Sequence, residues 1–522
     1  MKTLKFNNRF VDELPSDPVE SNSRRQVYGA CYSFVEPTPV IDPSLVSVSK
    51  EAAELFGLSE DDCHSETFLK TMSGNHLLDG MKPYAMCYGG HQFGNWAGQL
   101  GDGRAINLGD VINVPNNESW ALQLKGAGPT PYSRTADGLA VMRSSVREYL
   151  CSEAMFHLGV PTTRALSLVN TGEQVMRDML YDGNPEYEPG AVVCRVAPSF
   201  IRFGSFQLFA SRNETKELKQ LADFTIRTHF SHLLSSHEEG SKELYLAWFR
   251  EVCQTTVKMI VAWMRVGFVH GVMNTDNMSI HGLTIDYGPY GWLDDFNPEW
   301  TPNTTDAENK RYRYSQQPNI ALWNCFQLAN SLYLLVEDAQ VLESELQSFQ
   351  KSYESQWLTM MAAKLGFTGY LDGDEKLFQR LEVLLEVVET DMTIFYRLLA
   401  SETLTVDSFN DAYYQPDELP DSYKSSMAQW LVDYQQRLAN DNVDFATRKA
   451  AMNKVNPKYV FRNYLAQQAT EKAEAGDYSM VNELLDLFRS PYDEQPERAH
   501  YSVKRPDWAR TKVGCSMLSC SS

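Results

Sequence analysis

The residues best suited to chemistry lie in one stretch, residues 270–288, which reads HGVMNTDNMSIHGLTIDYG. Two short apolar runs, MSI and LTI, flank a His-Gly dipeptide, a pattern typical of a tight hairpin with a two-residue turn. That pairing would place Asn277 opposite Asp286, with their Cα atoms about 4.5–5.5 Å apart. Two hard oxygen ligands at this separation suit Mg²⁺ that is held together with substrate phosphates. Asp276 would then supply a free carboxylate beside the metal.

The same layout resembles the catalytic segment of protein kinases, in which HRDxxxxN is followed by a short hairpin and DFG. His270 and Gly271 stand at its first two positions, Asn277 at the Asn position, and residues 286–288 at DFG. Val272 stands where a kinase carries its catalytic Asp. The stretch therefore predicts a kinase-like metal site without the kinase base, the alternative being a hairpin with ordinary polar turn residues.

A glycine-rich segment, residues 88–111, precedes this stretch and contains seven glycines. Glycine lets backbone N–H groups approach phosphates closely. Gly101, Gly103 and Arg104 form a GDGR turn that runs into an expected strand, and a guanidinium at this position suits phosphate. Kinases cover nucleotide phosphates with such a turn, although glycine-rich hairpin loops are also common without a ligand.

Residues 118–125, ESWALQLK, alternate between apolar and less apolar positions and predict a strand that ends at Lys125. This lysine is the candidate for the kinase strand lysine, which pairs with phosphates and with a helix glutamate. A predicted helix over residues 144–158 offers two partners, Glu148 and Glu153. The alternatives are a surface lysine at a strand end and solvated helix glutamates.

Two arginines, Arg195 and Arg202, lie in the apolar segment AVVCRVAPSFIRFG. Arginines in such surroundings need anionic partners, because a buried unpaired charge is unfavourable. Nucleotide phosphates and an internal carboxylate are both open as that partner.

Composition limits the class of protein. Lys+Arg number 47 and Asp+Glu 68, a net charge of −21 that is spread along the chain. This argues against a nucleic-acid-binding surface. Nine scattered cysteines show no zinc spacing, and most are expected to be reduced core residues. We see no apolar run long enough to span a membrane and no signal peptide, so a cytoplasmic protein without a membrane partner is expected.

The order of the expected elements is sheet first and helices after, which predicts an α+β class. Polar, proline-containing residues 297–317 are expected to form a loop like a kinase activation segment. Further strands are expected near residues 165–169 and 191–196. Helices are expected over residues 47–56, 244–265, 319–336, 338–364, 374–401, 423–441, 458–474 and 477–488, with helical structure in general beginning near residue 218.

The motifs together resemble the selenoprotein O family. They read GHQFGNWAGQLGDGRA, KGAGPTPYSRTADG, MRSSVREYLCSEAM, GVPTTRALSLV, HGVMNTDN, DYGPYG and the terminal LSCSS, and they cover nearly the whole chain. The resemblance implies a bilobal protein-kinase-like fold, long classed as a pseudokinase. It also implies an enzyme that transfers AMP from ATP, bound in a flipped orientation, to Ser, Thr or Tyr hydroxyls of proteins. The expected division is a covering segment (1–87), a β-rich N-lobe (88–205), a helical C-lobe with the catalytic hairpin (206–425) and a helical extension with a cysteine tail (426–522).

The resemblance also assigns roles to individual residues. Asp276 is implied to be the proton acceptor, Asn277 and Asp286 the ligands of Mg²⁺ or Mn²⁺, and Glu148 the partner of Lys125. The residues implied to contact ATP are Gly101, Gly103, Arg104, Lys125, Asp137, Gly138, Arg195, Arg202 and Asp286.

Cys520 occupies the position where some family members carry selenocysteine. A regulatory disulfide from the tail to an activation-segment cysteine is suggested for some members, but residues 286–318 contain no cysteine. Cys515 is the alternative partner for Cys520. A monomer is expected. The competing functions are a kinase-type phosphotransferase that uses Asp276 as base, and a non-catalytic pseudokinase scaffold that binds ATP.

Overall fold

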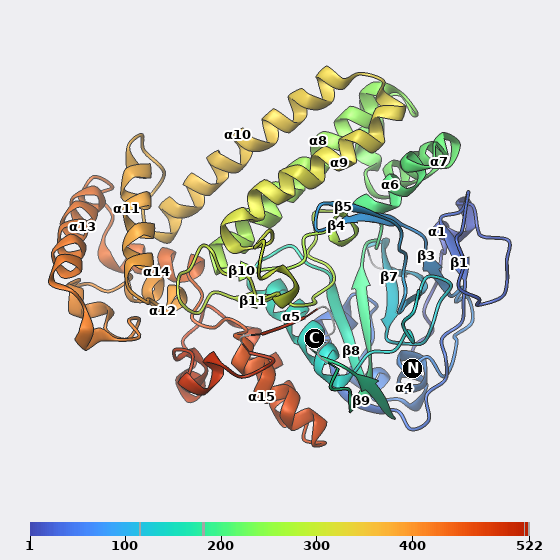
Figure 1. Ribbon diagram of the computed structural model, residues 1–522, viewed down its shortest axis with the longest axis horizontal. Coiled ribbons are helices and arrows are strands. Elements are labelled where there is room, and N and C mark those ends of the chain that lie inside the picture. Colours follow the sequence, from blue (N-terminus) through green and yellow to red (C-terminus); the bar gives the residue numbers. More distant parts are fainter. Residues whose placement is uncertain (114–115, 180–182, 516, 520–522) are drawn as a thin grey trace.

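A seven-stranded antiparallel sheet forms the N-terminal part of the computed structural model, which describes residues 1–113, 116–179, 183–515 and 517–519 (Figure 1). The strand order is β1-β3-β6-β7-β9-β8-β2. The strands are β1 (Tyr32–Phe34), β2 (Ser44–Val48), β3 (Tyr84–Met86), β6 (Ala105–Asn113), β7 (Glu118–Lys125), β8 (Arg164–Arg177) and β9 (Glu186–Ala197). The expected α+β class is confirmed, and the segment before residue 88 contributes three strands to the sheet itself.

Both faces of this sheet are buried around β7. Although the sequence of β7 alternates between apolar and less apolar residues, its last five residues, 121–125, are all buried. Strands β8 and β9 pack against helix α5 (Met142–His157), and Ala121 of β7 belongs to the same core. Leu122 and Leu124 face the other way, into a separate core built with the N-terminal helices α2 (Lys50–Glu54) and α4 (Glu66–Met72). The N-terminal segment thus covers one face of the sheet as well as extending its edges.

Helices make up most of the chain after residue 203. The longest, α8 (Lys242–Val266), α9 (Gln317–Val336) and α10 (Ala339–Lys364), pack together beside α6 (Phe203–Ser211) and α7 (Thr215–His229) (Figure 1). The others are α11 (Asp374–Val387), α12 (Met392–Leu398), α13 (Asp421–Ala439), α14 (Phe445–Val455), α15 (Asn463–Glu474) and α16 (Ser479–Phe488). In Figure 1, α11, α13 and α14 lie at the end of the molecule farthest from the sheet.

Three helix predictions are wrong in their extent. The helix expected over 47–56 is shorter, α2 (Lys50–Glu54), because residues 44–48 form strand β2. The helix expected over 374–401 is interrupted between α11 and α12, because Asp391 caps α12 by accepting from Ile394 N and its backbone bridges to Asp295. The helix expected from 458 begins at Asn463, and α14 was not predicted. In the last two places long-range backbone pairing competes with a pattern that is locally helical. Asp391 bridges to Asp295, and the N–H groups of Lys458 and Tyr459 donate to Pro491 O.

The predicted two-residue hairpin at 278–285 is also wrong. Met278 bridges to Thr284 rather than to residue 285, so Asn277 and Asp286 are not in register. Backbone N–H groups of this stretch instead bond to other segments of the chain. Ile280 N donates to Ile201 O (3.1 Å), and Thr284 N donates to Pro161 O (2.9 Å). A single 3₁₀ turn, η2 (Thr275–Asn277), precedes the bridge.

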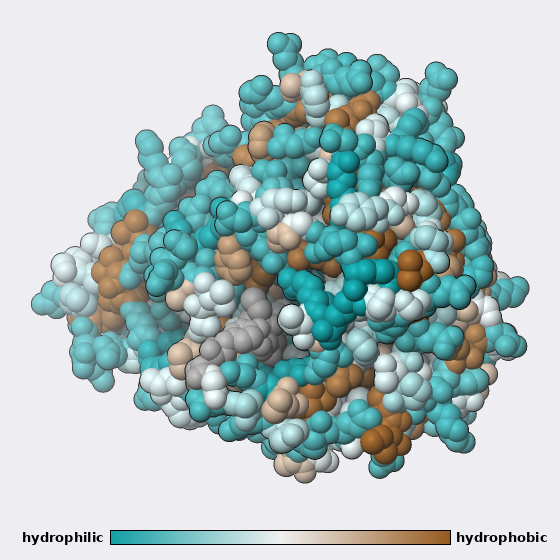
Figure 2. All heavy atoms as spheres, turned by 45° about the vertical axis from the view of Figure 1, so that its right-hand side comes forward, coloured by the Kyte–Doolittle hydropathy of each residue, from teal (hydrophilic) through white to brown (hydrophobic). Residues whose placement is uncertain are grey.

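The surface is consistent with the acidic composition. One face of the molecule is mostly hydrophilic, with apolar side chains in scattered patches (Figure 2). Among the described residues, no helix combines the length and the apolar character that crossing a membrane requires.

Candidate active site

One pocket of about 720 Å³ lies where the sheet meets the 272–289 loop. Every residue that was predicted from the sequence to bind ATP, a metal or a proton lines this pocket. These lining residues are Gly101, Gly103, Arg104, Lys125, Asp137, Gly138, Arg195, Arg202, Asp276, Asn277 and Asp286. Although the predicted hairpin register is wrong, Asn277 and Asp286 therefore still share one cavity.

Asp286 is the centre of the charge in this pocket. Its carboxylate accepts from Arg195 Nη1 (2.6 Å) and from Arg202 Nη1, and Lys125 Nζ lies 3.6 Å away. Burial alone would raise the pKa of Asp286, but Arg202, Arg195 and Lys125 overcome it and hold the pKa well below its usual range. Its backbone is left-handed (φ 57°), which is uncommon for a residue other than glycine and is characteristic of functional sites.

The predicted ion pair between Lys125 and Glu148 is present. Lys125 Nζ lies 2.6 Å from Glu148 Oε2, and the other oxygen of Glu148 accepts from Arg195 Nη1 (2.9 Å). Glu148 is buried on α5, and its two cationic partners lower its pKa against the opposing effect of burial. The second candidate, Glu153, pairs instead with Arg164 (2.6 Å) on β8. Because Lys125 and Arg195 share one glutamate, α5 fixes both cations.

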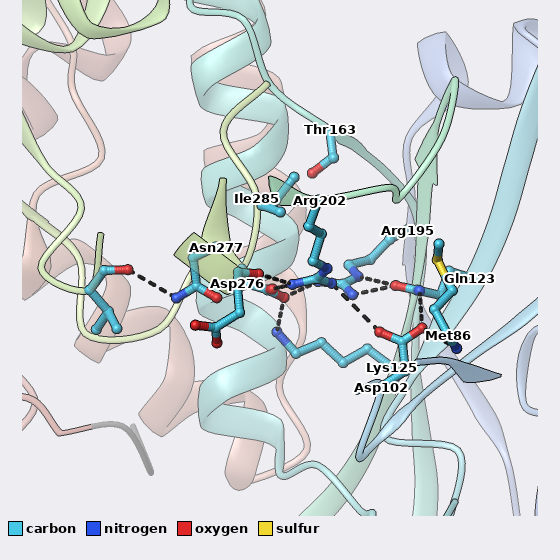
Figure 3. Close-up of polar contacts among 12 residues, drawn as sticks. Met86, Asp102, Gln123, Lys125, Thr163, Arg195, Arg202, Asp276, Asn277 and Ile285 are labelled. Carbon is cyan, nitrogen blue, oxygen red and sulfur yellow. Dashed lines mark hydrogen bonds and ion pairs between the residues drawn. The ribbon is translucent and has the colours of Figure 1, made fainter. Parts of the chain in front are cut away.

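The partners of the two buried arginines are internal carboxylates in this structure (Figure 3). Besides Asp286, Arg202 lies 3.6 Å from Asp102, and Arg195 Nε donates to Gln123 Oε1 (3.0 Å). Asp102 Oδ2 in turn accepts from Met86 N (3.0 Å) and from Gln123 Nε2 (3.3 Å).

The sequence did not single out Asp102 and Gln123, although both lie inside predicted motifs. Asp102 is the acidic residue of GDGR, and Gln123 lies two residues before Lys125. The signal that could have found Gln123 is its polar side chain on the same strand face as Lys125. In the sheet, Gln123 lies directly opposite Arg195 of β9.

Asn277 is oriented by the residue that departs from the kinase pattern. Its Nδ2 donates to the Val272 carbonyl (2.9 Å), which leaves Oδ1 as the oxygen available to the pocket (Figure 3). Asp276 lies next to it and is 7% exposed. Burial raises the pKa of Asp276 to about 6.

The donor set fits a divalent cation. Asn277 Oδ1 and the Asp286 carboxylate are hard oxygen ligands on one wall of the pocket. A second group with metal-like spacing, Glu51, Glu153 and His157, fits less well. Arg489 donates to Glu51 (2.7 Å) and Arg164 to Glu153, and none of the three residues of this group lines the pocket that contains the other predicted site residues.

The predicted Asp137–Gly138 segment is held at the pocket rim from β8. Arg177 donates to both oxygens of Asp137 (2.7 and 2.9 Å) and to Leu139 O (3.0 Å). Arg177 also lines the pocket, and no motif in the sequence indicated it.

The tail packs beside the predicted activation-segment-like loop. Leu518 O accepts from Thr304 N (2.8 Å), and Cys515 O accepts from Asn463 Nδ2 (2.9 Å). Cys515 is a buried free thiol, and burial raises its pKa to about 11. Cys520 lies outside the described residues, so the predicted pairing between these two cysteines stays a prediction.

The fold and the pocket define an α+β protein with a buried cluster of cations suited to a polyphosphate. The family model for protein adenylyltransferase SelO matches residues 20–489. The chain is 56% identical over 537 residues to a protein nucleotidyltransferase YdiU of Rhodopirellula baltica, covering 99% of each chain. Relatives with the same name from Flavobacterium johnsoniae and Aromatoleum aromaticum are 54% and 56% identical, with complete coverage of both chains. The chain belongs to the SelO family of protein adenylyltransferases, which confirms the resemblance drawn from its motifs.

Proposed function

We propose that this chain transfers AMP from ATP to Ser, Thr or Tyr hydroxyls of proteins and releases pyrophosphate. The observation that carries the proposal is the cluster of Lys125, Arg195 and Arg202 around one carboxylate at the base of the pocket. Three cations with a single shared Asp are poised to exchange that partner for the phosphates of a nucleotide. Family membership supplies the class of reaction.

In the proposed reaction the acceptor hydroxyl oxygen attacks the α-phosphorus, and the bond from that phosphorus to the β-phosphate bridging oxygen breaks. The hydroxyl proton passes to Asp276, whose pKa of about 6 leaves it largely ionised at neutral pH. Lys125, Arg195 and Arg202 bind the β- and γ-phosphates and stabilise the charge on the leaving pyrophosphate. The flipped nucleotide thus presents its α-phosphate to Asp276.

Asn277 and Asp286 would hold Mg²⁺ or Mn²⁺, which supplies charge neutralisation at the phosphate oxygens when bound. Gly101, Gly103 and Arg104 cover the nucleotide from the sheet, and Asp137 and Gly138 close the rim. Val272 is compatible with this chemistry, because phosphoryl-type transfer depends on positioning and electrostatics more than on a strong base.

The proposed architecture is the kinase-like one. Residues 88–205 serve as the N-lobe and 206–425 as the C-lobe, with 1–87 and 426–522 as additions. The pocket lining supports this division, because it comes from residues 88–202 on one side and from the 272–289 loop on the other. The proposed enzyme is a cytoplasmic monomer.

Labelled ATP separates this function from its competitors. The protein is incubated with ATP labelled at the α or the γ position, Mg²⁺ or Mn²⁺, and an acceptor protein. Label from the α position on protein is the expected result, whereas label from only the γ position would establish a kinase. ATP binding with no transfer from either position would establish a scaffold. Asp286→Ala is expected to abolish transfer, and Asp372→Ala, an exposed aspartate remote from the pocket, serves as the control.

A further inference from the structure

The hairpin formed by β4 (Gly89–Gln92) and β5 (Asn95–Gln99) is bonded directly to the loop that carries Asp276. His91 N donates to Thr275 Oγ1 (2.7 Å), and Phe93 N donates to Asn274 Oδ1 (3.2 Å). These two hydrogen bonds, each from a main-chain N–H to a side-chain oxygen, join segments that are more than 180 residues apart in the sequence. The hairpin is therefore attached to the loop on both sides of residue 92.

Between those two bonds, Gln92 reaches the Asp276 carboxylate. Gln92 Nε2 donates to Asp276 Oδ2 at 3.1 Å. The other carboxylate oxygen, Oδ1, is buried and has no hydrogen-bond partner among the described residues. Arg202 donates to the main-chain carbonyl of Asp276 (2.8 Å), not to its carboxylate. The carboxylate in fact points away from the guanidinium groups of Arg195 and Arg202 (Figure 3).

Gly90 makes room for this arrangement. A Cβ at residue 90 would lie 2.5 Å from Asp276 Oδ1 and 2.8 Å from Asp276 Cβ. Residue 90 has no left-handed backbone, so what excludes a side chain there is the space that Asp276 fills. The hairpin is also closely packed on α6, because a Cβ at Gly204 would lie 2.0 Å from the Gly89 carbonyl oxygen.

We propose that Gln92 is a positioning residue for AMP transfer, and that Gly90 is required beside it because it leaves the space in which the Asp276 carboxylate is held. The terminal torsion of an aspartate is broad, so a buried carboxylate with no second donor rotates unless something fixes it. Gln92 fixes it by occupying Oδ2. This inference rests on the proposed role of Asp276 as proton acceptor.

A merely structural role for Gln92 makes a different prediction. If Gln92 only attached the hairpin, its loss would loosen the whole segment and weaken nucleotide binding along with transfer. The bonds from His91 and Phe93 are donated by main-chain N–H groups, so they remain in a Gln92 variant. Positioning therefore predicts a defect in kcat with little change in the affinity for ATP.

The test compares Gln92→Leu, which removes the donor at nearly constant size, with Asn95→Ala. Asn95 pairs with Gln92 across the hairpin, and its exposed side chain makes only a 3.4 Å contact with Phe93 O, so it is a matched control. We expect Gln92→Leu to lower the single-turnover rate of AMP transfer at saturating ATP by about 10- to 100-fold, as small misplacements of a reacting group do. Its Kd for ATP should stay within about 2-fold of the wild-type value, a change of only some 0.4 kcal/mol. Asn95→Ala should match the wild type in both.

A double-mutant comparison separates failure of this inference from failure of the proposed function. If Gln92 acts through Asp276, adding Gln92→Leu to Asp276→Ala should cause no further loss. Full activity of Asp276→Ala would overturn the proposed role of Asp276. A large defect in Asp276→Ala with a normal rate in Gln92→Leu, or fully additive losses, would overturn the positioning role alone.

Gly90→Ala supplies an independent measurement. Its methyl group must displace the Asp276 carboxylate, so its transfer rate should fall at least as far as that of Gln92→Leu, again with ATP binding retained. A wild-type rate in Gly90→Ala would contradict the claim that the carboxylate has to lie where the structure places it. Melting temperatures of both variants confirm that the protein is folded.

Discussion

The charge network around Asp286 predicts that the metal and the nucleotide bind cooperatively. In this structure the Asp286 oxygens are engaged by Arg195 and Arg202, whose side chains are each 2% exposed. A divalent cation that bound Asp286 alone would leave these guanidiniums without that partner. Breaking a buried ion pair by removing one partner costs about 3–5 kcal/mol. Because the Asp286 side chain is 20% exposed, the lower value of this range applies.

A penalty of about 3 kcal/mol corresponds to roughly a 100-fold weaker affinity for the metal in the absence of nucleotide. Polyphosphate replaces Asp286 as the partner of the arginines and removes this penalty. By linkage, the metal should strengthen ATP binding by the same factor. Isothermal titration of Mn²⁺ into the protein, with and without a non-hydrolysable ATP analogue, measures both sides of this coupling.

A substitution tests whether competition between the arginines and the metal for Asp286 causes this coupling. Arg202→Met removes one cation that competes for Asp286, so it should tighten the binding of Mn²⁺ alone while weakening the binding of the analogue. Arg212→Met is the control, because Arg212 donates to Val27 O and lies outside the pocket lining. Equal Mn²⁺ affinity with and without the analogue would refute the coupling. Unchanged or weaker Mn²⁺ binding in Arg202→Met would refute its electrostatic origin.

Three further outcomes can be checked. Glu148→Gln and Glu153→Gln should both lower the melting temperature, since each removes a buried carboxylate that pairs with a buried cation. Only Glu148→Gln should weaken ATP binding, by about 10-fold or more, in a nucleotide titration. Burial raises the pKa of Glu382 from 4.5 to about 7. As pH rises between those values, the unfolded chain loses this proton first, so the stability of the folded protein falls. Glu382→Gln should therefore raise the melting temperature at pH 8 and not at pH 4, and an equal gain at both pH values would contradict this. The Cys515 thiol is buried, with its pKa raised to about 11, so native protein should alkylate there far more slowly than urea-unfolded protein, as peptide mass spectrometry can measure.

The predicted site residues could be selected from the sequence because each motif carries its candidate chemistry on a local stretch. GDGR, LKG, ADG and the TDN–DYG segment each place a functional side chain on a short, recognisable stretch, and all of them line one pocket. For Lys125, a strand end followed by a helix limited the partners to Glu148 and Glu153, and the family resemblance selected Glu148, which lies 2.6 Å from Lys125.

What the sequence did not reveal depends on contacts between distant segments. Asp102 and Gln123 become part of the site only when β9 and α6 bring Arg195 and Arg202 beside them. The hairpin register was wrong because Ser279 pairs with Arg202, a partner that no local pattern indicates. Strands β1 and β3 were missed for a similar reason, since each is only three residues long and is stabilised by its neighbours in the sheet.

Residues 463–489 pack against helix α5 and against residues 47–51 near the start of the sequence. This contact bears on when the pocket can form during synthesis. Helices α15 and α16 pack on α5, Asn482 Oδ1 accepts from Ser47 Oγ (2.8 Å), and Arg489 donates to Glu51 (2.7 Å). A nascent chain that has not yet supplied these helices leaves the outer side of α5 exposed, although α5 carries Glu148 and so anchors Lys125 and Arg195. Domains usually fold in the order in which they are synthesised. Here we expect the candidate pocket, whose lining lies within residues 88–289, to reach its final structure only after helices α15 and α16 have been synthesised.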